Sequence, residues 1–141
     1  MSTFLDFCKD LPVINFEAGD FVIEEGNMEG RLLFLSSGEI EIFKSGNLIN
    51  TVVLPGTVIG EVSALLGRPH SASVHAKTPC SFYVADNPDV FLSENPEIAL
   101  KIARTLAGRL YSVTNQLADR LSADEPGQLS DMLKSLYEGG K

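Results

Sequence analysis

The sequence contains no tryptophan and only two cysteines, Cys8 and Cys80, which lie far apart. Disulfide frameworks and zinc sites need more cysteines at closer spacing, so we expect two reduced thiols that pack as small apolar side chains. Histidine is equally scarce, with only His70 and His75. A metal centre in a small barrel needs three or four ligands, so no metal site is predicted.

Long hydrophobic runs are also missing. No stretch approaches the roughly 18 consecutive apolar residues that a membrane helix requires. The first ten residues, MSTFLDFCKD, carry acids and a lysine where a secretory signal would have an apolar run. We therefore expect no membrane association and a cytoplasmic location.

Basic residues are few, and they are unevenly distributed. The chain has 11 Lys and Arg against 19 Asp and Glu, a formal net charge of −8. Residues 1–100 hold 14 acids and 5 bases, a net of −9, whereas residues 101–141 hold 5 acids and 6 bases, a net of +1. Nucleic-acid binding depends on a basic surface. We therefore predict no nucleic-acid partner, and the roughly 20 residues after residue 121 are too few for a helix-turn-helix module.

The first 85 residues are typical of a protein built from short strands. Runs rich in Val, Ile and Phe alternate with Gly, Asn, Ser and Pro, at residues 21–23, 31–35, 39–43, 51–54, 73–76 and 82–84. Residues 36–38 and 45–47 are predicted to be hairpin turns. The pattern predicts a mainly β fold, a barrel or jelly roll, in a chain of one domain's length.

A long helix is predicted after the strands. Asn95, Pro96 and Glu97 suit a helix start, and the helical pattern continues to about Leu121. Its apolar residues are spaced alternately by four and three, as in a coiled-coil seam: Ala99, Ala103, Leu106, Leu110, Val113 and Leu117. The seam either packs on the chain's own barrel or contacts a partner. We predict a homodimer, or a heteromer with a partner helix, through Leu106, Leu110, Val113 and Leu117.

Residues 1–121 are thus expected to form the barrel with its closing helices, and residues 122–141 a short amphipathic helix and tail. The break at 122–127 contains Pro126 and Gly127. The apolar face of the last helix would cap either the barrel or the stripe on the long helix, or dock on a partner; its residues are Leu129, Met132, Leu133 and Leu136.

The segment 58–74 carries the chemistry. Gly60 precedes a predicted short helix at about residues 61–66, which Gly67 and Pro69 end. Free N–H groups in the first turn of a helix favour an anion, and Glu61 can accept hydrogen bonds from hydroxyl groups. Such a segment suits a sugar phosphate.

This segment resembles the phosphate-binding cassette of cyclic-nucleotide-binding domains, F-G-E-x-A-L followed by R-[ST/A]-A-[TS]-V. The chain has I-G-E-V-S-A-L-L-G-R-P-H-S-A-S-V. Further fragments resemble the family in the same order: Gly19-Asp20, Glu25-Gly26, the pair of strands around Ser37-Gly38-Glu39, and Pro55-Gly56. The resemblance covers roughly residues 11–121. It implies a jelly-roll (double-stranded β-helix) barrel with a short cassette helix and a long C-terminal helix.

The resemblance also implies a site and a function. Gly60 and Glu61 would meet the ribose, and the N–H groups around Ser71 and Ala72 would hold the cyclic phosphate of cyclic AMP or cyclic GMP. The candidate ligand-binding residues are Gly60, Glu61, Val62, Ser63, His70, Ser71 and Ala72. The implied function is a non-enzymatic regulatory sensor without a bound cofactor, which couples pocket occupancy to its C-terminal helices and a partner protein.

One position departs from the family pattern. His70 stands where the family has the arginine that grips the phosphate. Arginine offers a rigid, always charged fork, and loss of a charge-assisted bond lowers affinity roughly 10- to 150-fold. Arg68 lies two residues away, but Pro69 fixes the backbone between them. The alternative is therefore a degenerate domain that acts as a ligand-independent interaction or scaffold module.

Overall fold

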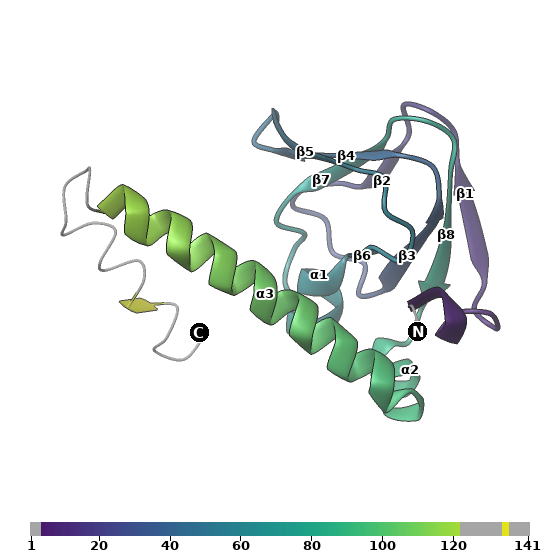
Figure 1. The fold of residues 1–141 in the computed structure, drawn as a ribbon. Coiled ribbons are helices and arrows are strands. Elements are labelled where there is room, and N and C mark those ends of the chain that lie inside the picture. Colours follow the sequence, from purple (N-terminus) through teal and green to yellow (C-terminus); the bar gives the residue numbers. More distant parts are fainter. Residues whose placement is uncertain (1–3, 122–133, 136–141) are drawn as a thin grey trace. The chain divides into compact units, whose positions relative to one another are not determined.

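Eight strands form two antiparallel four-stranded sheets, and the computed structural model describes residues 4–121 and 134–135 of the chain (Figure 1). The first sheet has the order β1 (Val13–Phe16), β8 (Cys80–Ala85), β3 (Leu32–Ser37) and β6 (Val58–Ile59). The second has the order β2 (Phe21–Ile23), β7 (Ser73–Ala76), β4 (Ile40–Lys44) and β5 (Asn47–Val52). The two sheets form the predicted jelly roll, within a unit that spans Met1–Ala99.

Helices lie before, between and after the strands along the chain. A 3₁₀ turn, η1 (Phe4–Phe7), precedes the strands, and α1 (Glu61–Leu66) connects β6 of one sheet to β7 of the other. After β8 come α2 (Pro88–Glu94) and α3 (Pro96–Leu121). The predicted short helix at residues 61–66 and the predicted start of the long helix are both confirmed.

The core lies between the inner rows of the two sheets. It joins Leu33 and Leu35 of β3 to Ile40 of β4 and to Phe82 of β8, all at most 1% exposed. Because side chains alternate along a strand, Phe34 lies on the opposite face of β3, where its ring meets Phe91 of α2 at a centroid distance of 5.8 Å.

The two cysteines are buried thiols, as predicted. Burial raises the pKa of the Cys8 thiol to about 12. Burial also raises the pKa of Cys80, whose Sγ donates to the carbonyl oxygen of Glu39 at 3.1 Å. Both side chains serve as small core residues.

The strand and turn predictions differ from the structure in four places. The segments 21–23 and 73–76 match β2 and β7, but β5 covers Asn47–Val52 rather than 51–54, and β1 and β6 were not predicted as strands. The predicted hairpin at 36–38 is wrong, because β3 and β4 belong to different sheets and the chain turns a corner there. The turn at Ser45 and Gly46 is a true two-residue hairpin, with φ of 51° and 81°.

Burial along α3 is greatest at Ile98 and Ile102, which are 0% and 4% exposed and lie outside the predicted stripe. Within the stripe, Leu110 and Val113 are 42% and 47% exposed, and Leu106 and Leu117 are partly buried. A second unit spans Leu100–Lys141. The predicted short helix and tail at 122–141, with Leu129, Met132, Leu133 and Leu136, lie outside the described residues except for 134–135.

No helix of residues 4–121 or 134–135 is both long and apolar enough to cross a membrane.

Candidate functional site

The cassette begins at Gly60, where only glycine fits. Its φ is 83°, a conformation that L side chains rarely adopt. A Cβ built there would lie 2.7 Å from the carbonyl oxygen of Arg31. The backbone of the segment before β3 therefore lies directly against the entrance to α1.

Ser63 fixes the helix to the loop between β2 and β3, which we call the clasp loop and define as residues 24–30. The side chain is 2% exposed, and its Oγ accepts from the backbone N–H groups of Glu29 at 3.2 Å and Gly30 at 3.0 Å. The predicted ligand-binding serine is thus a buried acceptor for the clasp loop.

Glu61 and Val62 lie in the first turn of α1, where both are partly buried. The sequence predicted that Glu61 contacts the ribose, and its place beside Gly60 keeps it at the entrance to the cassette. Gly67 ends the helix, and its N–H donates to the carbonyl oxygen of Ser63 at 3.0 Å.

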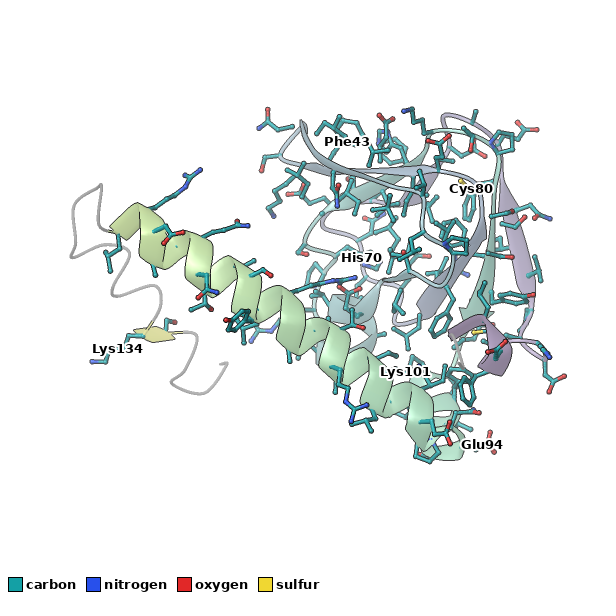
Figure 2. All side chains as sticks on the ribbon, viewed as in Figure 1. Phe43, His70, Cys80, Glu94, Lys101 and Lys134 are labelled. Atoms are coloured by element: carbon teal, nitrogen blue, oxygen red, sulfur yellow. The ribbon has the colours of Figure 1, made fainter. Side chains whose placement is uncertain are left out.

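His70 is held by its backbone on both sides. Its N–H donates to the carbonyl oxygen of Asn27 at 2.7 Å, and its own carbonyl oxygen accepts from the N–H of Gly26 at 3.0 Å. The clasp loop therefore pairs with the cassette at this residue, which belongs to the barrel unit (Figure 2).

The imidazole of His70 faces a carboxylate. Its side chain is 3% exposed, and Nε2 lies 3.6 Å from Oε1 of Glu29, too far for a hydrogen bond. Nε2 has no hydrogen-bond partner, and the same is true of the buried Nε of Arg31. The other oxygen of Glu29 lies 3.3 Å from Nη2 of Arg31. Glu29 thus stands between two nitrogen-bearing side chains.

The end of the cassette meets a different cation. Nζ of Lys44 donates to the carbonyl oxygen of Ser71 at 2.6 Å and to Oε2 of Glu25 at 3.2 Å. The other oxygen of Glu25 accepts from the N–H of Ser45 at 3.0 Å, and this bond, followed by Lys44, lowers the pKa of Glu25. Oγ of Ser73 accepts from the N–H of Glu25 at 2.9 Å.

The clasp loop therefore contacts the predicted cassette along its length, at Ser63 in α1, at His70 and at Ser73 in β7. Sequence reasoning missed the contacts that four residues make at the cassette. These residues are Glu25, Glu29, Arg31 and Lys44. Glu25 belonged to a fragment that resembles the family, so its position carried a signal. The other three are brought to the cassette by tertiary contacts that no local pattern records.

His75 is separate from this arrangement. It lies between the rings of Phe21 and Phe43, at centroid distances of 4.2 Å and 4.7 Å. In the part of the chain that the structure describes, no three His, Cys, Asp or Glu side chains gather as a metal site.

Known proteins resemble this chain in sequence. The CRP-like cAMP-activated global transcriptional regulator of Mycobacterium tuberculosis is 30% identical over 137 residues, which are 92% of this chain and 61% of that protein. The cGMP-dependent protein kinase egl-4 of Caenorhabditis elegans is 30% identical over 124 residues, 87% of this chain and 15% of the kinase. The chain thus spans less than two thirds of either relative.

The fold is shared with a solved structure, that of the Thermus thermophilus catabolite activator protein. The TM-score is 0.74 at 24% identity, and the match covers 84% of this chain and 59% of the other. The family model described as the cyclic nucleotide-binding domain matches residues 13–91, from the first residue of β1 into α2. That match spans more than half of the sequence, and it shows that this chain belongs to the cyclic nucleotide-binding domain family.

Proposed function

We propose that the chain is a non-enzymatic regulatory sensor that binds cyclic AMP or cyclic GMP at the cassette. The observation that carries this proposal is the cassette itself, with Gly60 tight against the backbone of Arg31 and Ser63 and His70 tied to the clasp loop. A segment held at three points is preorganised, and preorganisation reduces the cost of binding. Two relatives are described as cAMP-activated and cGMP-dependent.

The proposed contacts follow the resemblance residue by residue. Gly60 and Glu61 would meet the ribose, with Val62 beside them, and the N–H groups around Ser71 and Ala72 would hold the cyclic phosphate. Ser63 is also a candidate ligand-binding residue, and its bonds from the clasp loop would support the site. No cofactor is part of the proposal.

A second function is favoured by His70. Its imidazole is buried and faces Glu29, so it does not offer the open charged fork of an arginine. This observation favours a degenerate domain that acts as a ligand-independent interaction or scaffold module.

In either case the C-terminal helices would be the part of the chain that contacts a partner protein. The stripe of Leu106, Leu110, Val113 and Leu117 is the proposed contact with a second copy or a partner helix, and Leu110 and Val113 are exposed. Light scattering at several concentrations, on wild type and on Leu110→Glu, tests this part. A wild-type monomer at high micromolar concentration excludes the homodimer.

Nucleic-acid binding by this chain is not part of the proposal. The relative from Mycobacterium tuberculosis is described as a transcriptional regulator, but this chain covers 61% of it. The formal charge of −8 opposes a polyanionic partner.

Titration calorimetry of the full chain with cyclic AMP and cyclic GMP decides between the sensor and the scaffold. The sensor predicts micromolar binding of one of them, and linear 5′-AMP and 5′-GMP serve as ligand controls. Glu61→Gln should weaken that binding, whereas Glu97→Gln, which removes the same charge from the start of α3, should not. Absence of binding to wild type would reject the sensor for these ligands.

A further inference from the structure

Strand β5 lies at the edge of its sheet, beside β4 (Figure 1). The other edge strands of the two sheets are β1, β6 and β2. An edge strand carries backbone groups that can pair with another chain, and proteins commonly block such edges by short length, charged residues or proline. β5 has six residues, whereas β1, β6 and β2 have four, two and three. In the part of the chain that the structure describes, β5 is therefore the longest edge.

Charged residues do not protect this edge. Glu17 follows β1 directly, and Asp20 and Glu24 flank β2. In contrast, residues 45–60 contain no Asp, Glu, Lys or Arg, although these residue types make up 21% of the chain. Residues 1–100 carry 14 acids against 5 bases, so two barrels repel each other over most of their surfaces. The uncharged edge at β5 lets two copies approach with little repulsion.

Apolar side chains are exposed on and after β5. Leu48 and Ile49 are 52% and 59% exposed, and Val53 and Leu54, which follow the strand, are 58% and 70% exposed. Ile49 is the extra residue of a bulge against β4. Because a bulge interrupts regular pairing, the part of the edge that can take another strand is the part after it, from Asn50 onward.

The N–H of Thr51 points away from β4. It donates to Oδ1 of the neighbouring Asn50 at 2.9 Å, although Thr51 lies opposite Glu41 in the ladder. Residue pairs in an antiparallel ladder alternate between those that exchange two N–H···O bonds and those whose backbone groups face away from each other. Thr51 belongs to the second kind, so its N–H and C=O groups face the open edge. Asn50 supplies the acceptor that a neighbouring strand would otherwise provide.

From this edge we propose that β5 pairs antiparallel with β5 of a second copy. A two-fold axis relates two identical antiparallel strands, so the surface is its own complement and the contact closes at two subunits. The two four-stranded sheets would then form one continuous sheet across the dimer. The strand offers no charged side chain that a charged peptide could recognise, which favours a copy of the chain as the occupant. The contact is separate from the stripe on α3 and does not depend on nucleotide binding.

The first test removes the outward donor of Thr51. Proline lacks the N–H and is tolerated where the N–H of an edge strand faces outward, so Thr51→Pro should leave the β4 ladder intact. Each copy would lose one donor to the other, which should raise the dimer dissociation constant about tenfold or more. Thr51→Val is the matched control, because it keeps the N–H and a branched side chain, and a change within about twofold is expected. Sedimentation equilibrium of the full chain at several concentrations measures these constants, and urea denaturation checks that each variant is folded.

A second pair of variants places charge on two different edges. Val53 and Val13 are exposed to similar extents, 58% and 55%, but Val13 lies in β1 of the other sheet. Val53→Glu brings like charges close together across the two-fold axis and should weaken the dimer about tenfold, whereas Val13→Glu should not. Added salt should strengthen the wild-type dimer, since it screens the repulsion between the acidic barrels.

Hydrogen exchange shows what covers the edge. In a dimer through β5, the N–H of Thr51 should exchange more slowly as the protein concentration rises, in wild type and in Leu110→Glu alike. A wild-type monomer at high micromolar concentration overturns the proposal. A dimer that Leu110→Glu abolishes and Thr51→Pro leaves intact also overturns it, because α3 would then be the interface. Slow exchange at Thr51 that does not change with concentration would mean that the chain covers its own edge, and it would reject a second copy as the occupant.

Discussion

The two ends of the cassette are built by different means. At its start, Gly60 and Ser63 are fixed by backbone contacts: a carbonyl oxygen where a Cβ would be, and two N–H groups on one hydroxyl oxygen. At its end, the contacts are made by charged side chains, with Glu29 beside His70 and Glu25 beside Lys44. We therefore expect substitutions at the start to affect mainly stability, and substitutions at the end to affect mainly the proposed binding of an anion.

Substitution of Gly60 should give the largest effect on stability. Gly60→Ala places a Cβ 2.7 Å from a backbone oxygen at a φ of 83°, which combines overpacking with backbone strain. We expect a loss of about 3 kcal/mol or more in the free energy of unfolding, measured by urea denaturation.

Gly67→Ala is the matched control. Gly67 has a φ of 64° but no atom within 4 Å of its Cβ position, so only strain of about 1–2 kcal/mol is expected. Equal losses for the two variants would mean that the close approach at Gly60 does not matter.

Substitution of Ser63 should give the next largest loss of stability. Ser63→Ala leaves the N–H groups of Glu29 and Gly30 without their acceptor in a part-buried site, for a cost of about 1–3 kcal/mol. Ser73→Ala removes one bond at an exposed position, where water can replace it, for about 0.5–1 kcal/mol. A larger loss at Ser73 would reverse the proposed order of the two contacts.

His70→Arg tests the other end of the cassette. It restores the arginine fork and should strengthen the binding of cyclic AMP or cyclic GMP about tenfold, which corresponds to about 1.4 kcal/mol. Calorimetry on wild type and variant measures the change. If the variant binds neither nucleotide, the pocket is blocked or reshaped, and the sensing function should be abandoned for these ligands.

The smallest expected effect is on the pH dependence of stability. The N–H of Ser45 and the ammonium of Lys44 lower the pKa of Glu25 in the folded chain. A lowered folded pKa adds stability above the unfolded pKa, and this stability is lost as pH falls through the folded value. Wild type should therefore unfold at a higher urea concentration than Glu25→Gln at pH 6, and this difference in midpoint should shrink below about pH 4.

Glu24→Gln is the control for that experiment, because Glu24 lies in the same loop and contacts Asn27 instead. A difference between wild type and Glu25→Gln that stays constant from pH 6 to pH 3 would show that the carboxylate charge does not stabilise the clasp loop.

Local signals predicted much of this chain. Gly60, the helix at Glu61–Leu66 and the start of α3 at Pro96 each follow from residues a few positions apart, because caps, turns and helix periods act over one or two turns. The two-residue turn at Ser45 and Gly46 belongs to the same class. The order of the fragments around the cassette was enough to indicate the family.

Only the tertiary structure decided the contacts between distant segments. The corner at residues 36–38 looked like a hairpin because turn residues do not record which sheet the next strand joins. No local pattern indicated that the clasp loop, more than thirty residues earlier in the chain, donates two N–H groups to the hydroxyl oxygen of Ser63. His70 faces Glu29, and Lys44 reaches Ser71, because two sheets and a loop converge on the cassette. Sequence spacing determines which residues the cassette contains, but the charges around it depend on packing between segments that the sequence keeps apart.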